Sequence, residues 1–210
     1  NQVNYQLNSY DTSYSFGSQL HFAHELSAYV EDEFSLGSRI KSNAGLHFST
    51  FIVGNSIYNS LQPRLSSRIL IDDKSSFKAS YARMAQFLHL LTNSGIGLPT
   101  DLWLPATERV KPQFSNQWAL GYARTFLKKY EVSIEGYYKT MENLIEYKDG
   151  ASFFNAELDW QDKVHSGRGW SYGGELLLEK KIGKATGWIG YTISWTNRQF
   201  DSLNFGDPFP

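Results

Sequence analysis

The chain has 210 residues, and its 20 Lys and Arg nearly balance 21 Asp and Glu, for a formal net charge of −1. This neutrality leaves no electrostatic footprint for nucleic acid. The sequence contains no Cys, which excludes disulfides, a thiol nucleophile and a Cys-based zinc site. Aromatic residues are abundant, with 6 Trp, 13 Tyr and 14 Phe. Length alone leaves open whether these residues form one large domain or two small ones.

Apolar and polar residues alternate along most of the chain, which is the two-residue period of a β-strand with one apolar side. In 117–126, for example, Trp118, Leu120 and Tyr122 alternate with small or polar residues. We therefore expect an all-β fold that forms an antiparallel up-and-down meander. Its strands are predicted at 3–10, 19–34, 39–54, 59–71, 76–91, 114–127, 130–148, 168–181 and 185–199, with a weak extra hairpin near 151–160.

The alternation also assigns side chains to the two faces of the sheet, because a shift of one residue would exchange the faces. The apolar face is predicted to carry Leu46, Phe48, Leu65, Ile69, Leu120, Ile134, Leu176, Leu178, Ile189 and Ile193. The opposite face is predicted to carry Arg64, Arg68, Glu131, Glu135 and Glu175.

The connections between the predicted strands alternate in length. The short ones are Ser35–Ser38, Asp72–Ser75, Leu127–Lys129 and Ile182–Lys184, and the long ones are Thr92–Gln113 and Lys148–Gly167. Short turns at one end and long loops at the other are typical of an outer-membrane barrel wall, whose apolar face meets lipid. Long loops gathered at one end favour a binding surface there.

Histidines and glycines offer two weak motifs. His21 and His24 are three residues apart, so on a strand they face opposite sides, which disfavours a metal site. The other histidines are interpreted as lumen or loop residues. The glycines of 166–174 superficially follow a phosphate-binding pattern, but no helix begins after them, so we interpret them as easing strand bending.

Paired carboxylates do not indicate an enzyme. Glu131 and Glu135, like Glu175 and Glu179, are four residues apart on a strand, about 13 Å by strand rise, which is too far for a hydrolytic pair. No Ser has a His and an Asp at a recognisable spacing. We predict no catalytic residue, no metal ligand and no cofactor.

Aromatic residues fall into two groups. Trp118, Tyr138, Tyr172 and Trp195 are predicted to form a membrane-interface girdle, with the core of a soluble sandwich as the alternative. The second group lies in or beside the long loops, where its members could stack on a ligand or hold the loops in place. The candidate ligand-binding residues are Trp103, Arg109, Trp160, Arg168 and Trp170.

From about Glu25 onward the sequence resembles the barrel of TonB-dependent outer-membrane receptors, in the form found in Bacteroides-like bacteria. The resemblance is carried by PRLSSRILIDDKSSFKASYARMAQFLHLLTNSG, LPTDLWLPATERVKPQFSNQWALGYAR, YEVSIEGYYKTMENLIEY and GWSYGGELLLEKKIGKATGWIGYTISWTNRQF. It implies that residues 1–210 form part of a transmembrane β-barrel wall, without the plug and the TonB-binding segment. It also implies a location in the outer membrane of a Gram-negative bacterium.

Further implications of the resemblance concern partners. They are membrane lipid, the TonB complex through the missing N-terminal part, and a nutrient ligand such as an iron chelate, a cobalamin or a glycan. A partial wall has two open edges, so self-association of the segment is expected. The alternative function is a soluble all-β binding or adhesion module, with an enzyme a distant third. A soluble module would pack its apolar strand faces against each other, whereas a barrel wall would expose them.

Overall fold

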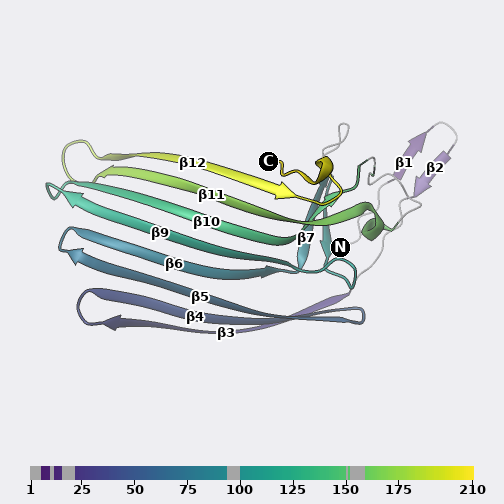
Figure 1. Ribbon diagram of the computed structural model, residues 1–210, viewed down its shortest axis with the longest axis horizontal. Coiled ribbons are helices and arrows are strands. Elements are labelled where there is room, and N and C mark those ends of the chain that lie inside the picture. Colours follow the sequence, from purple (N-terminus) through teal and green to yellow (C-terminus); the bar gives the residue numbers. More distant parts are fainter. Residues whose placement is uncertain (1–5, 10–11, 16–21, 94–99, 150, 152–158) are drawn as a thin grey trace.

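The computed structural model describes residues 6–9, 12–15, 22–93, 100–149, 151 and 159–210. Its body is one antiparallel sheet of 8 strands in the order β12-β11-β10-β9-β6-β5-β4-β3 (Figure 1). The strands are β3 (Ala23–Leu36), β4 (Ile40–Val53), β5 (Ser56–Asp72), β6 (Ser75–Gln86), β9 (Gln113–Phe126), β10 (Tyr130–Tyr147), β11 (Val164–Lys180) and β12 (Gly187–Gln199). The predicted antiparallel meander is confirmed, with β3 and β12 at the open edges.

The structure also contains smaller elements. A hairpin of β1 (Gln6–Ser9) and β2 (Thr12–Ser15) occupies the N-terminal region, and a second hairpin, β7 (Leu88–Asn93) and β8 (Thr100–Pro105), lies between β6 and β9 in sequence. Two 3₁₀ turns, η1 (Trp160–Lys163) and η2 (Asn204–Gly206), follow β10 and β12. Within the described ranges, no helix has the length and apolar character needed to cross a membrane.

The predicted strand 76–91 is wrong, because it comprises two elements that separate at Phe87. The Phe87 ring is buried and stacks on Phe51 at 4.9 Å, and its carbonyl accepts a hydrogen bond from Ala106 N at 2.7 Å. The chain therefore leaves the large sheet here, and β6 pairs with β9 across the inserted hairpin. The loop predicted at Thr92–Gln113 consequently contains β8.

Two other predicted elements also differ. The predicted strand 3–10 contains β1, and β2 pairs with it as a second strand. The weak hairpin near 151–160 falls largely on 152–158, outside the described residues, and Trp160 begins η1 instead.

Strand length and connection length match a membrane-spanning wall. The strands β5, β10 and β11 have 17, 18 and 17 residues, more than the roughly 9–11 that cross a bilayer. The four connections predicted to be short lie together at one end of the sheet, which we call the turn end (Figure 1). The β7–β8 hairpin and η1 lie at the opposite, loop end, which also holds a short turn at Gly54, where the predicted strands 39–54 and 59–71 leave a short connection.

The strand register confirms the predicted faces. Ile134 stands opposite Tyr122 on β9 and Leu176 on β11, and the row continues to Tyr191 on β12. We call this the outer face, and the opposite, polar face the inner face. Ile134 is 55% exposed, and among the described residues no second sheet covers the outer face. The packed pair of apolar faces that a soluble sandwich requires is therefore missing from the described part of the chain.

One glycine on the inner face makes room for an aromatic ring. Gly173 stands opposite Tyr137, and a Cβ added to it would lie 2.9 Å from the Tyr137 ring and 2.7 Å from the Ile193 carbonyl oxygen. A Cβ on Gly174, which points to the outer face, would meet only the Glu135 carbonyl oxygen at 3.8 Å. The close approach of Tyr137 and of the β12 backbone therefore requires a glycine at position 173, in addition to any role in strand bending.

Gly173→Ala is expected to lower the free energy of unfolding by about 1–3 kcal/mol, because the backbone of β12 cannot shift cheaply away from the new methyl group. Gly174→Ala is the matched control and should have little effect. Urea unfolding of the intact receptor folded in lipid would measure both. Equal effects of the two substitutions would contradict the close approach at Gly173.

Candidate functional site

The loop end is held together by two hydrophobic clusters. The first joins the β7–β8 hairpin to β10 and β11 and contains Leu91, Leu104, Val110, Ile145 and Val164. The second joins β4 to the two residues that flank the β7–β8 hairpin and contains Phe51, Val53, Phe87 and Ala106. These contacts pack β7, β8, the segment that follows β8 and η1 against the ends of the large strands.

Buried polar contacts accompany the clusters. Asn143, which has a positive φ of 57° at a bulge in β10, donates through Nδ2 to the Pro112 carbonyl at 2.8 Å. His89 on β7 is fully buried, and its Nδ1 lies 3.0 Å from Gln113 Nε2. Burial lowers the pKa of His89 from 6.5 to about 4, although a hydrogen bond with the Lys111 backbone partly opposes this shift.

The buried His89 makes the hairpin pH-sensitive. Its folded pKa is below the unfolded value, so its neutral form stabilises the hairpin above about pH 6.5, and this stabilisation is lost as the pH falls towards about 4. We expect hydrogen exchange of the β7–β8 amides, corrected for intrinsic rates, to reveal more frequent opening across this window. His89→Gln should remove that pH dependence, and its persistence in the variant would contradict the assignment to His89.

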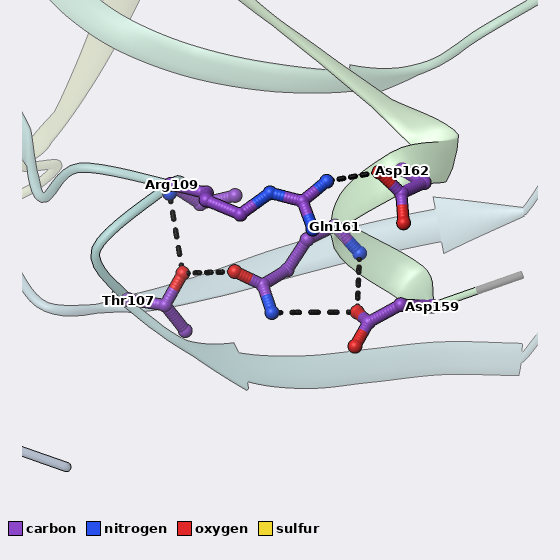
Figure 2. Close-up of polar contacts among 6 residues, drawn as sticks. Thr107, Arg109, Asp159, Gln161 and Asp162 are labelled. Carbon is purple, nitrogen blue, oxygen red and sulfur yellow. Dashed lines mark hydrogen bonds and ion pairs between the residues drawn. The ribbon is translucent and has the colours of Figure 1, made fainter.

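A polar bridge links the β8–β9 loop to η1 (Figure 2). Thr107 Oγ1 donates to Gln161 Oε1 at 2.6 Å and accepts from Val110 N at 3.2 Å. Gln161 N in turn donates to Asp159 Oδ1 at 2.9 Å, and Arg109 forms an ion pair with Asp162. Side chains of the β8–β9 loop and of η1 therefore hold these two segments together.

The structure brings together only part of the predicted ligand-binding set. Arg109 forms its ion pair with Asp162 of η1. Trp160, the first residue of η1, packs against the first cluster, and this contact fixes η1 to the strands. Trp103 on β8 is 62% exposed. Arg168 and Trp170 lie on the same side of β11 as Tyr172, which is the outer face, and Arg168 Nε donates to Gln199 Oε1 at 3.0 Å.

The inner face carries a segregated row of charges that the sequence analysis found only in part. In register across β4, β5 and β6 stand Lys41, Arg68 and Lys78, and after Gly121 the same row continues with Glu135 and Glu175. A depression of about 310 Å³ lies over this row. Lys41 forms an ion pair with Glu33.

Like charges directly opposite each other on neighbouring strands are destabilising. The row of Lys41, Arg68 and Lys78 is therefore expected to be covered by water or by a polar partner. The predicted inner-face positions of Arg64, Arg68, Glu131, Glu135 and Glu175 are confirmed by the register. Lys41 and Lys78 occupy polar positions of the alternation, and only the register shows that they join Arg68. Among the described residues, no three His, Asp or Glu side chains converge as metal ligands, and His21 lies outside these residues.

A scan against protein-family models decides the family. The model described as "TonB dependent receptor-like, beta-barrel" matches residues 1–210, which is the whole chain. The chain belongs to this family. It is thus part of an outer-membrane receptor barrel of a Gram-negative bacterium, as the resemblance predicted. A search of the curated proteins found no match.

Three solved structures share the fold of this receptor barrel. The FrpB iron transporter from Neisseria meningitidis (F3-3 variant) is 12% identical with a TM-score of 0.65, over 89% of this chain and 27% of that chain. The alcaligin receptor FauA from Bordetella pertussis is 18% identical with a TM-score of 0.59, over 90% and 32%. The ferripyoverdine receptor of Pseudomonas aeruginosa is 12% identical with a TM-score of 0.58, over 96% and 25%. The chain thus spans about a third or less of these proteins.

Membership of the receptor family indicates what each face of the sheet contacts. The apolar outer face meets lipid and the charged inner face meets the barrel interior. The predicted girdle residues Trp118, Tyr138, Tyr172 and Trp195 lie on the outer face in one cross-strand row. The Tyr172 and Trp195 rings stack at 5.4 Å. Long loops are the extracellular end of such barrels and short turns the periplasmic end.

Proposed function

We propose that the chain forms part of the wall of a receptor that imports a nutrient ligand across the outer membrane with energy supplied through TonB. The observation that carries the proposal is the asymmetry of the sheet, with an exposed apolar outer face, a charged inner face and an ordered loop end. An iron chelate is the first ligand to test, because similar structures are named for an iron transporter and for ferripyoverdine. Cobalamin and glycan fragments are the other candidates.

The ligand surface in this proposal is the loop end. Trp103 is its strongest candidate, because its exposed indole on β8 can stack on a ligand. Arg109 would change partners from Asp162 to an anionic ligand group, and Trp160 would hold η1 in position. Arg168 and Trp170 would act at the outer rim of this surface.

In this proposal, the plug, the TonB-binding segment and the remaining barrel strands come from other parts of the receptor. The plug and the TonB-binding segment would be supplied by other regions of the protein, with the plug facing the charged inner row. Further barrel strands would pair with β3 and β12, the open edges of the sheet. In a preparation of the segment alone, a second copy would satisfy those edges, which is the basis for the expected self-association.

The test is growth of the source bacterium with the receptor gene deleted, on ferric chelates, cobalamin or oligosaccharides as limiting nutrients. We expect loss of growth on one class, rescue by the intact receptor, and weaker rescue by the receptor with Trp103→Ala. Leu88→Ala, an exposed apolar residue of the same hairpin, is the control for loop-end substitutions. Normal growth of the deletion strain on all three classes would contradict the proposed uptake.

A further inference from the structure

Five lysines gather at the turn end of β9–β12. Lys128 and Lys129 lie in the β9–β10 turn, Lys180 ends β11, and Lys181 and Lys184 lie in the β11–β12 turn. The two turns are joined directly, because Lys181 N donates to the Lys129 carbonyl at 2.8 Å. We call these five lysines, which the two joined turns and the end of β11 carry, the basic rim.

The basic rim has more positive charge than its neighbours neutralise. Lys181 Nζ lies 2.7 Å from Glu131 and 3.6 Å from Glu179, so one lysine serves both carboxylates. In the part of the chain that the structure describes, the other four lysines have no carboxylate partner. At the neighbouring β5–β6 connection, Asp72 and Asp73 outnumber Lys74, so the positive charge there is balanced.

Aromatic residues place the basic rim at the edge of the lipid-facing band. On the outer face of β9 and β10, Trp118 stands opposite Tyr138 at one level and Phe126 opposite Tyr130 at another. The two levels are separated by about 27 Å along the strands, which is about 19–22 Å along the membrane normal at the usual strand tilt of about 35–45° and comparable with the apolar band of about 25 Å that aromatic girdles bound. Phe126 and Tyr130 therefore lie at the membrane interface of the turn end.

One lysine of the basic rim reaches directly onto this interface. Lys180 stands in register with Tyr130 on the outer face, and its Nζ lies 6.0 Å from the centre of the Tyr130 ring. Arg124 lies in the same way over Phe126, at 5.5 Å. Cations stacked on interface aromatics continue the lipid-facing surface into the charged turns.

We propose that the basic rim binds the headgroups of anionic phospholipids in the membrane leaflet at the turn end. The partner follows from charge complementarity and from continuity with the lipid-facing surface, since a phosphate beside Tyr130 and Lys180 belongs to a lipid whose acyl chains cover the outer face. Lysines near a membrane surface attract anionic lipid cumulatively. Binding at this rim would hold β9–β12 at a fixed depth in the membrane.

The test is lipid binding to the intact receptor by native mass spectrometry in detergent, with dioleoyl phosphatidylglycerol compared with dioleoyl phosphatidylcholine. We expect the receptor to retain phosphatidylglycerol preferentially. The triple variant Lys128→Gln, Lys129→Gln and Lys184→Gln should lower that affinity at least about tenfold. These three exposed turn residues have no ion pair to lose, so the barrel should stay folded.

The matched control is Lys41→Gln, Arg68→Gln and Lys78→Gln, which removes the same charge from the inner face and should leave lipid binding unchanged. An excess of inorganic phosphate should not displace the lipid, whereas displacement would show a site for a free anion. The proposal is overturned if the receptor has no preference for phosphatidylglycerol, if the rim variant keeps it, or if both triple variants lose it equally.

Discussion

Ile134→Lys is expected to lower the free energy of unfolding of the intact receptor in a lipid bilayer by about 2–4 kcal/mol, since it places a charge at the middle of the lipid-facing band. Ile134 lies on the outer face midway between Tyr130 and Tyr138, and its side chain is more than half exposed. Urea titration in lipid vesicles, followed by heat-modifiable migration on gels, would measure the loss.

The matched control is Ser133→Lys, one residue away on the inner face between Glu131 and Glu135, where a lysine meets carboxylates and the barrel interior. It should cost little. Tyr130→Lys, at the interface, should cost less than Ile134→Lys because the penalty falls to about 0–1 kcal/mol towards the membrane surface. Equal costs at positions 133 and 134 would contradict the assignment of the faces.

Leu91→Ala is expected to destabilise the loop end by about 2–5 kcal/mol while leaving the transmembrane strands folded. Leu91 is 2% exposed and packs with Leu104, Val110 and Val164, so its truncation leaves a cavity beneath the β7–β8 hairpin. Hydrogen exchange of the intact receptor should show faster opening of β7, β8 and η1, with unchanged protection in β9 and β10.

Leu88→Ala provides the control within the same strand, because Leu88 is 46% exposed. Its effect on exchange should be small. If Leu91→Ala unfolds the large sheet together with the hairpin, the loop end is not a separate unit of stability. If the two substitutions have the same effect, the cluster around Leu91 does not anchor the hairpin.

Much of the sheet could be predicted because alternation determines which side of a strand each residue occupies. Leu120, Ile134 and Leu176 were assigned to one face from sequence, and the register of β9, β10 and β11 places them on that face together. The break at Phe87 could not be predicted in this way. The alternating pattern runs through β6 and β7 alike, and the cause of the break is tertiary, namely the stacking of Phe87 on Phe51.

The functional surfaces depended still more on tertiary structure. The predicted strand boundaries placed Arg109 and Trp160 in long loops, but their contacts with Asp162 and with the cluster around Leu91 are tertiary and do not follow from the sequence. The cationic row of Lys41, Arg68 and Lys78 spans three strands. Its members are recognisable as polar positions, and their alignment requires a register that period alone does not supply.

The lipid-facing position of the outer face is tested most directly by measuring the environment of each residue from Tyr130 to Tyr138, in the intact receptor in a bilayer. Single cysteines along β10 would carry spin labels, whose collision rates with oxygen and with a water-soluble nickel chelate distinguish lipid from water. We predict that even-numbered positions collide mainly with oxygen, with a maximum at 134, and that odd-numbered positions collide less with oxygen. A profile without this two-residue period, or with its phase reversed, would contradict a lipid-facing outer surface.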